Sequence, residues 1–304
     1  MSKAARLREK TARERIAAQQ AAARRAEGRR RMLLFGSSIV VVIAVVVGLV
    51  VAYNLRSPSS STTAGGVHGT VLPASTAAEI TSVPAATLNE IGGGSVPGYQ
   101  GTVYTGPPIV KISGTSLTSG GKPEMLYIGA EYCPYCGAMR WAMAVALSRF
   151  GHFTTPLRGF HSSPTDVDPN TPTLTFYQAG YTSKYLTFVP VENEDISEKP
   201  LQATTSAQQA IWQKYDTQSD GYTGYPFVDF GNETALKGPI YDPAVLKGLT
   251  WAQVASDLHD PKSPVARAAD GAANYITAAI CHMTGNKPGS VCTSSAIASL
   301  ESSL

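Results

Sequence analysis

Residues 125–150 read MLYIGAEYCPYCGAMRWAMAVALSRF, and this segment decides the fold. It begins with the apolar run 125–128, which has the length and composition of a buried strand. From Gly137 onward, apolar residues recur at intervals of three and four, as on one face of a helix. A Cys-x-x-Cys motif, Cys133-Pro134-Tyr135-Cys136, lies between these two elements. We therefore expect the dithiol where a strand turns into a helix.

The first turn of a helix favours a thiolate. Its backbone N–H groups lack intrahelical partners, and the helix dipole adds partial positive charge there. Cys133 is expected at this end, and Pro134 suits the first turn because its missing N–H has no helical partner to lose. Cys136 follows about one helical turn later, close enough to bond Cys133. Cys133 is thus predicted to attack a disulfide and Cys136 to resolve the mixed disulfide.

The run 130–136 (AEYCPYC) resembles the active-site segment of the thioredoxin-like superfamily, and its Cys-Pro-Tyr-Cys tetrad is typical of glutaredoxins. That superfamily also has a cis-proline beside the dithiol, at the start of a later strand. The matching candidate is Pro226, in the segment 224–232 (GYPFVDFGN). The resemblance implies an α/β thioredoxin-like fold, a central mixed sheet flanked by helices. It further implies a catalytic role for Pro226, which faces the dithiol and shapes the substrate groove together with Tyr225. Tyr132, Pro134 and Tyr135 are also expected to bind substrate.

One position departs from the pattern of thioredoxins. They have a buried acidic residue in the strand before the motif, and here Tyr127 occupies the corresponding position. Glu131 and water are therefore the two candidates for proton transfer to or from Cys136.

Two metal-binding roles and one structural role are alternatives for the dithiol. A zinc site needs about four ligands, and Cys281 and Cys292 do not have the spacing of a zinc knuckle. Copper delivery is an alternative, with His152 or His161 as an added ligand. A purely structural bond between Cys133 and Cys136 is disfavoured, because so short a loop restrains little of the unfolded chain. The sequence favours redox chemistry, with no metal and no organic cofactor.

The N-terminal region predicts a membrane anchor. Residues 1–31 hold eleven Lys and Arg against three Glu, a charge of +8, although the whole chain carries only +3. The next 24 residues, 32–55, are uncharged and rich in Val, Ile, Leu and Ala. About 20 apolar residues span a bilayer as a helix, and the positive flank holds that side in the cytoplasm. The apolar run is too long for a cleaved signal peptide, so we expect a retained single-pass signal anchor in the cell membrane.

Five regions follow from this pattern: a basic cytoplasmic tail (1–31), a transmembrane helix (32–55), a flexible linker (56–79), an extracytoplasmic thioredoxin-like domain (80–294) and a C-terminal tail (295–304). The linker includes the Ser/Thr/Gly-rich stretch 57–69. The basic tail is interpreted as a topology signal that favours anionic lipid, and no nucleic-acid partner is expected.

Within the domain, the patterns predict several elements. Strands are expected near 109–112, 227–230 and 235–240, and helices near 85–91, 205–215, 250–258 and 263–283. Residues 151–221 are expected to be an insert that shapes substrate access. Its strand-like runs 174–177 and 185–189 are expected to pair as a hairpin that includes a core strand. Four tyrosines could line a peptide groove: Tyr177, Tyr181, Tyr185 and Tyr222.

Cys281 and Cys292 complete an even number of cysteines in a domain expected outside the cytoplasm. A structural disulfide between them is favoured over a second redox pair that relays electrons. The segment 279–285 (AICHMTG), with Val291 and Cys292 after it, resembles an uncharacterised prokaryotic family of membrane-anchored thioredoxin-like proteins. Together with the dithiol motif, this resemblance covers residues 80–294.

The sequence therefore predicts a membrane-anchored thiol–disulfide oxidoreductase that acts on protein thiols and disulfides. A membrane redox partner is expected to recharge its dithiol. The competing hypothesis is a non-catalytic thioredoxin-like module for binding, assembly or copper delivery.

Overall fold

The computed structural model describes residues 68–94, 108–217 and 221–304, in which strands and helices are interspersed. In chain order the elements are β1 (Thr70–Val71), α3 (Ala74–Thr81), α4 (Ala85–Ile91), β2 (Ile109–Lys111), β3 (Thr118–Ser119), β4 (Lys122–Ala130), α5 (Pro134–Ser148), β5 (Gly151–Phe153), β6 (Arg158–His161), β7 (Pro172–Thr175), β8 (Tyr181–Ser183), β9 (Thr187–Glu194), α6 (Ser206–Asp216), β10 (Phe227–Phe230), β11 (Thr234–Lys237), the 3₁₀ turn η2 (Pro243–Leu246), α7 (Trp251–Asp257), α8 (Pro264–Met283), α9 (Gly289–Cys292) and α10 (Ser295–Glu301).

The main sheet is mixed. Its strands run in the order β2-β11-β10-β4-β3, and β9 is a further partner of β4. β4 and β9 are parallel, whereas the other pairs are antiparallel. A parallel pair needs a long connection between its strands, and the chain between β4 and β9 contains α5. Two smaller sheets, β1-β6-β7 and β5-β8, are also present. Strands β5 to β8 lie between α5 and β9 in the chain, whereas β1 precedes α3.

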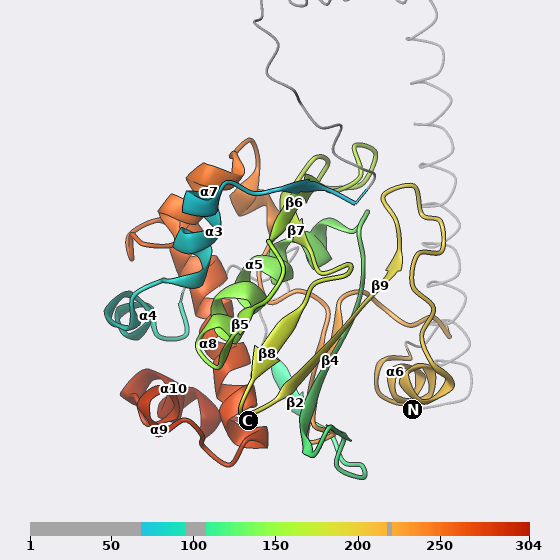
Figure 1. The fold of residues 1–304 in the computed structure, drawn as a ribbon, viewed down its shortest axis with the longest axis vertical. Helices are drawn as coiled ribbons and strands as arrows, with labels where there is room; N and C mark the ends of the chain where they lie inside the picture. The colour runs from blue at the N-terminus through green and yellow to red at the C-terminus, as the bar shows by residue number, and fades with distance from the viewer. Residues whose placement is uncertain (1–67, 95–107, 218–220) are drawn as a thin grey trace, which may run out of the picture. The chain divides into compact units, whose positions relative to one another are not determined.

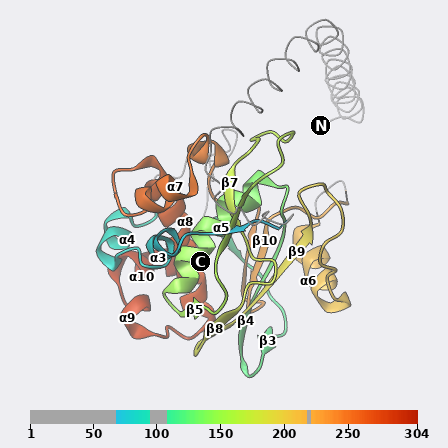
Figure 2. The ribbon, with the colours of Figure 1, turned by 45° about the horizontal axis from the view of Figure 1, so that its top comes forward.

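The central strand β4 is buried on both faces. Met125 and Tyr127 belong to the large core shared with α5 and α8, whereas Leu126 and Ile128 pack in a second cluster with Trp212 of α6. Because successive side chains of a strand point to opposite faces, this alternation places helices on both sides of the sheet. Figures 1 and 2 show α6 on the opposite side of the sheet from α5 and α8. The prediction of a mixed sheet flanked by helices is confirmed.

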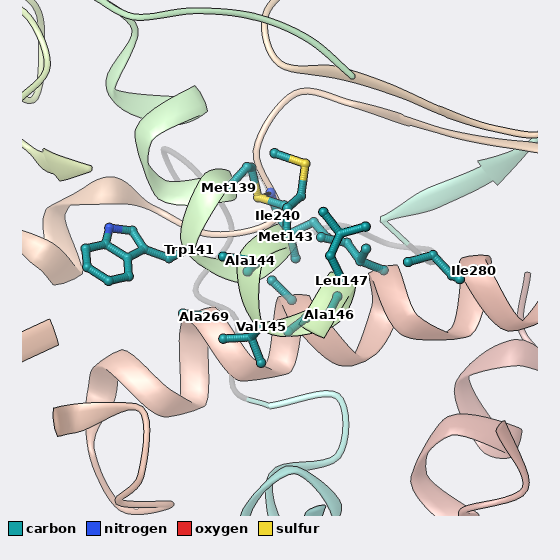
Figure 3. Close-up of a cluster of buried hydrophobic side chains, with 14 of the residues drawn as sticks. Met139, Trp141, Met143, Ala144, Val145, Ala146, Leu147, Ile240, Ala269 and Ile280 are labelled. Carbon is teal, nitrogen blue, oxygen red and sulfur yellow. Dashed lines mark hydrogen bonds between the residues drawn. The ribbon is translucent and has the colours of Figure 1, made fainter. Parts of the chain in front are cut away.

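Helix α5 lies at the centre of the larger core. All but two of its residues, Tyr135 and Ser148, are buried. Small side chains such as Ala146 and Ala269 lie between α5 and α8, as Figure 3 shows. Trp141 donates from Nε1 to the Pro172 carbonyl oxygen at 2.9 Å, so this large residue also keeps its polar atom satisfied. The helix that begins at the dithiol is therefore held firmly along its length.

Most predicted helices are found within a residue or two of their expected bounds. α4 coincides with the prediction, and α8 begins after the cap Ser263, whose Oγ accepts from the Val265 N–H. Thr205 and Thr250 each form a capping box at the start of α6 and α7. These signals are local in the chain, and reciprocal hydrogen bonds at the cap fix the helix start.

The predicted hairpin of 174–177 with 185–189 is wrong. The first run belongs to β7, which pairs with β6, and the second belongs to β9, which pairs with β4. β9 continues to Glu194 and joins the main sheet along the buried strand β4, so its pairing is decided by a partner far away in the chain. The strand predicted at 235–240 is shorter, because Gly238 takes a left-handed φ of +90° after β11.

Ordered structure extends beyond the domain bounds expected from the sequence. Residues 70–81, assigned largely to the linker, form β1 and α3, and Ile80 is fully buried. The expected C-terminal tail contains α10, whose Ile297 is buried in the large core. In both segments, an apolar side chain that has polar neighbours in the sequence is buried in the hydrophobic core of the domain.

The predicted transmembrane helix (32–55) and the basic tail lie outside the described residues. Among the helices that are described, none combines the length and apolar character needed to cross a membrane.

Candidate active site

Cys133 is the N-cap residue of α5. It lies three residues after the end of β4, and its Sγ accepts a hydrogen bond from the Cys136 backbone N–H at 3.2 Å. Pro134 takes the first helical position, as the sequence indicates. The Cys133 sulfur therefore satisfies one of the free N–H groups of the first turn.

Cys136 lies beneath Cys133. Both side chains are free thiols; Cys136 is fully buried and Cys133 is 5% exposed. Burial raises the pKa of Cys136 well above its ordinary value, and the neighbouring Cys133 adds to this rise. Arg140 and a backbone hydrogen bond from Ala130 act in the opposite direction. Cys133 is thus the more accessible thiol and Cys136 the more protected one.

Pro226 lies at the same end of the sheet as the dithiol. The Tyr225–Pro226 peptide bond is cis, and Pro226 is buried directly before β10. In the antiparallel pairing of β10 with β4, Phe227 is opposite Ile128, two residues before the end of β4. The register therefore brings Pro226 to the edge where β4 ends and the Cys-x-x-Cys begins.

Tyr225 packs against the buried dithiol cluster of Ala130, Cys133 and Cys136, together with Tyr132 and Tyr135. The Tyr132 and Tyr225 rings meet edge to face with centroids 6.4 Å apart. Burial raises the pKa of both phenols, so both stay neutral. The structure thus gathers the five residues expected to bind substrate around the two thiols.

Two residues that the sequence did not single out hold Tyr225. Its ring stacks on Trp212 of α6 at a centroid distance of 5.1 Å, and its Oη accepts from Asn193 Nδ2 at 2.6 Å. Oη also donates to Glu194 Oε1 at 3.4 Å. Trp212 itself donates from Nε1 to the Gly224 carbonyl oxygen. These contacts fix the aromatic wall in one orientation.

A fully buried ion pair lies behind Cys136. Arg140, one helical turn after Cys136, donates from Nε to Glu192 Oε1 at 2.8 Å and from Nη2 to Glu192 Oε2 at 2.5 Å. Neither side chain is exposed. No local sequence pattern predicts this pair, since 52 residues separate its partners. Buried charges need such pairing because desolvation of an isolated ion is costly.

Tyr127 of β4 is the residue that the resemblance to thioredoxins singles out, at the position expected for a buried acid. Its side chain is fully buried, and its Oη is without a hydrogen-bond partner among the described residues. Burial raises the pKa of this phenol well above its ordinary value. Gly129 makes the arrangement possible, because a Cβ there would meet Tyr127 Oη at 2.0 Å. Tyr127 is therefore a neutral, buried phenol.

Glu131 is fully buried and hydrogen-bonded. Its Oε1 accepts from Thr175 Oγ1 at 2.7 Å, and its Oε2 lies 3.1 Å from His68 Nδ1. Burial raises the pKa of this carboxyl, and the two hydrogen bonds partly offset that rise. In the described part of the chain, these hydrogen bonds connect Glu131 to β7 and to the segment before β1, and none joins its side chain to either cysteine.

The four tyrosines considered for a groove are not gathered at the dithiol. Tyr177 packs on His68 and lines a cavity of about 360 Å³ with it. Tyr181 donates from Oη to the Leu147 carbonyl oxygen, near the far end of α5. Tyr185 packs against the large core, and Tyr222 is 76% exposed. The predicted groove of these four residues is not present as one surface.

The histidines considered as added metal ligands lie apart from the dithiol. His161 packs on Trp251, and His152 belongs to β5 beyond the C-terminal end of α5. Across residues 68–94, 108–217 and 221–304, no group of three or more His, Cys, Asp and Glu side chains is placed to hold a metal ion.

Cys281 and Cys292 form a disulfide, the pairing that the sequence favours. It joins the end of α8 to α9 and belongs to the large hydrophobic core. Cys133 and Cys136 lie in a separate cluster at the start of α5. The disulfide and the dithiol are therefore distinct sites.

These features define a mixed α/β protein with a Cys-x-x-Cys dithiol at the N-terminus of a buried helix. The chain belongs to the family described as Domain of unknown function (DUF929), whose model matches residues 108–282. The matched region contains both thiols, Pro226 and the Arg140–Glu192 pair. No curated protein and no solved structure matches the chain.

Proposed function

We propose that this protein is a membrane-anchored, extracytoplasmic thiol–disulfide oxidoreductase with a thioredoxin-like fold. The observation that carries the proposal is the position of Cys133: it caps α5 and accepts the Cys136 N–H, with Cys136 buried beneath it. This arrangement provides one accessible nucleophile and one protected resolving thiol. The buried Pro226 and the aromatic residues around it support the same interpretation.

The reaction proceeds in two exchanges. The Cys133 thiolate attacks one sulfur of a client disulfide, the client S–S bond breaks, and the released client thiolate takes up a proton. The Cys136 thiolate then attacks the Cys133 sulfur, which expels the second client thiol and leaves a Cys133–Cys136 disulfide. The client disulfide gains two electrons and two protons, and the dithiol loses them. The reverse sequence oxidises a client dithiol.

Client binding is assigned to the surface around the dithiol. Tyr225 and Pro226 form its wall, and Tyr132, Pro134 and Tyr135 complete it. Since Trp212 and Asn193 hold Tyr225 in place, the wall is formed before a client arrives. A preformed surface reduces the ordering cost of binding.

Glu131 is proposed as the group that exchanges protons with the dithiol. It is two residues before Cys133, and burial raises the pKa of this carboxyl, which favours its uptake of a proton. His68, at the cavity shared with Tyr177, contacts its carboxylate. A membrane redox partner is proposed to recharge the dithiol.

The proposal is tested by redox titration of the full-length protein in detergent. Glutathione buffers of stepped composition set the potential, and alkylated thiols are counted by mass spectrometry after each equilibration. Cys133 and Cys136 are expected to titrate as one two-electron pair, while Cys281 and Cys292 stay oxidised. A midpoint near about −120 mV indicates a disulfide donor, and one near about −270 mV indicates a reductase.

Cys133→Ser is the matched control, since it removes the nucleophile and changes one atom. A dithiol that does not titrate would overturn the oxidoreductase proposal. Copper retained by the purified protein in that case would support the delivery module instead.

A further inference from the structure

Arg140 connects the buried ion pair to the dithiol through the peptide backbone. Its Nη2 donates to the Ala130 carbonyl oxygen at 2.7 Å as well as to Glu192. The same carbonyl accepts the Cys133 backbone N–H at 3.3 Å. Ala130 also provides a backbone hydrogen bond to Cys136. One guanidinium therefore braces the residue that contacts both cysteines.

Glu192 and its neighbours hold the guanidinium in one orientation. Glu192 Oε1 accepts from the Phe176 backbone N–H at 3.0 Å in addition to Arg140 Nε. Arg140 Nη1 reaches Thr173 Oγ1 at 3.4 Å, and the guanidinium lies over the rings of Tyr127 and Phe160 at 5.9 and 5.6 Å. A cation with this many fixed partners cannot turn away when the charge on Cys136 changes.

We propose that Arg140, oriented by Glu192, is a positioning residue that supplies the positive charge needed to form the Cys136 thiolate for the resolving step. This inference rests on the proposed thiol–disulfide exchange and names the group that makes its second half efficient. Cys136 and Arg140 are four residues apart on α5, so both lie on one side of the helix.

The charged and titratable groups around Cys136 come from several elements. Cys133 and Arg140 face it from α5 and its cap, Tyr127 from β4, and Tyr132 and Tyr225 from the adjoining loops. The three phenols stay neutral because burial raises the pKa of each. In the mixed disulfide, Cys133 has no proton to release. Glu131, whose pKa burial raises, interacts with the same Arg140 and Glu192. Arg140 is then the permanent positive charge that acts on Cys136, with Glu192 beyond it.

The step concerned is the resolution of a mixed disulfide. The Cys136 thiolate attacks the Cys133 sulfur, the bond from Cys133 to the client sulfur breaks, and the client leaves as a thiolate that takes up a proton. No external electron is needed. The rate follows the thiolate fraction of Cys136, offset in part because a more acidic thiol is a weaker nucleophile, with a Brønsted coefficient of about 0.4–0.5.

Two charge variants should change this rate in opposite directions. Glu192→Gln leaves the positive charge of Arg140 unneutralised and should favour the thiolate. Arg140→Met/Glu192→Met removes both charges and should disfavour it. A tenfold change in thiolate fraction, offset by nucleophilicity, changes the rate by about threefold. We therefore expect the mixed disulfide to be resolved about threefold faster in Glu192→Gln and about threefold slower in the double variant. The pH profile of the rate should shift to lower pH in Glu192→Gln and to higher pH in the double variant.

The measurement uses the full-length protein in detergent, loaded with glutathione on Cys133 by reaction of the reduced protein with oxidised glutathione. Release of glutathione is followed by rapid acid quench between pH 5 and pH 10. Arg140→Lys keeps the positive charge but loses the bidentate contact with Glu192, so it is expected to resolve the adduct more slowly than wild type and faster than the double variant. Urea unfolding of each variant reports stability separately.

The outcomes separate the two proposals. If the glutathione adduct does not form, or is never resolved, the oxidoreductase proposal fails. If wild type resolves but the double variant keeps the wild-type pH profile, the role of Arg140 is overturned. If Glu192→Gln fails to fold, the double variant and Arg140→Lys still test the role of Arg140. A Lys variant as slow as the double variant would mean that the shape of the Arg140 side chain, and not its charge, sets the rate, which would overturn the proposal.

Discussion

The backbone N–H of Cys136 donates to the Cys133 sulfur at 3.2 Å, so the buried thiol and the capping thiol belong to one helical turn. The two cysteines therefore have different roles in thiol–disulfide exchange. A client can reach only the outer sulfur, and only the inner sulfur can displace the client once a mixed disulfide has formed.

Serine variants of the two cysteines should therefore differ in whether they form mixed disulfides with clients. Cys136→Ser leaves the nucleophile but removes the resolving thiol, so mixed disulfides with clients should accumulate. Cys133→Ser should form none, because Cys136 is fully buried. Non-reducing gels of membranes from cells that express each variant provide the measurement. Adducts of equal amount on both variants would contradict the assigned roles.

Tyr225 offers a test of the client wall. Tyr225→Ala removes the ring that stacks on Trp212 and should slow exchange with a protein client by about tenfold, the equivalent of one aromatic contact of about 1.4 kcal/mol. Exchange with glutathione, which needs less surface, should change little. Tyr225→Phe is the matched control: it loses the hydrogen bonds with Asn193 and Glu194 and should cost about 1 kcal/mol of stability. Equal slowing with both substrates would argue against a docking role.

Glu131 should give the dithiol reaction a pH dependence. The carboxylate accepts a proton only above its pKa, which burial raises, so the rate of dithiol oxidation should rise with pH through that range. Glu131→Gln should remove this rise and slow the reaction at neutral pH by about tenfold or more. Thr175→Val is the control, because it deletes one hydrogen bond to Glu131 but keeps the carboxyl group. A Gln variant with an unchanged pH–rate profile would leave water as the proton carrier.

The Cys281–Cys292 bond should contribute stability and no exchange chemistry. It closes a loop with a sequence separation of 11 residues, for which the chain-entropy model gives about 3 kcal/mol. Cys281→Ala/Cys292→Ala should therefore lower the unfolding free energy by about this amount in urea titrations. The glutathione titration of Cys133 and Cys136 should be unaffected, and a shifted midpoint would instead indicate a relay between the two pairs.

What the sequence could predict depended on how close the interacting residues lie in the chain. Thr205 and Thr250 cap helices through bonds to residues three positions away, and such starts were predicted correctly. The motif and its resemblance located both thiols and Pro226. The contacts that complete the site join distant segments: 63 residues separate His68 from Glu131, and 52 separate Arg140 from Glu192. No local pattern encodes such a pair, because only the parallel pairing of β9 with β4 brings Glu192 to the dithiol edge.

Asp270 of α8 should make the stability of the fold depend on pH. Its side chain is fully buried, and both carboxylate oxygens lack a hydrogen-bond partner among the described residues. Arg149 donates instead to Asn274 and Thr277 of the same helix. Burial raises the pKa of Asp270 to about 8, and Arg149 offsets this only in part.

The sign of the effect follows from proton binding. Between about pH 4 and pH 8 the folded protein keeps a proton on Asp270 that the unfolded chain has lost. Stability from this group is thus complete at low pH and falls as pH rises, by up to about 1.4 kcal/mol per pH unit. Asp270→Asn should remove this dependence on pH. The unfolding free energy of the variant minus that of wild type should therefore increase steadily as the pH rises to 8.

Urea unfolding of wild type and Asp270→Asn at pH 6, 7 and 8 measures this difference. The range is chosen because burial raises the pKa of a second core carboxyl, Asp229, only to about 6, so its own slope lies below these values. Asp229→Asn is the control and should change the pH dependence only below pH 6. A constant difference between wild type and Asp270→Asn would mean that the carboxyl is ionised in the folded state, with Arg149 as its counter-ion.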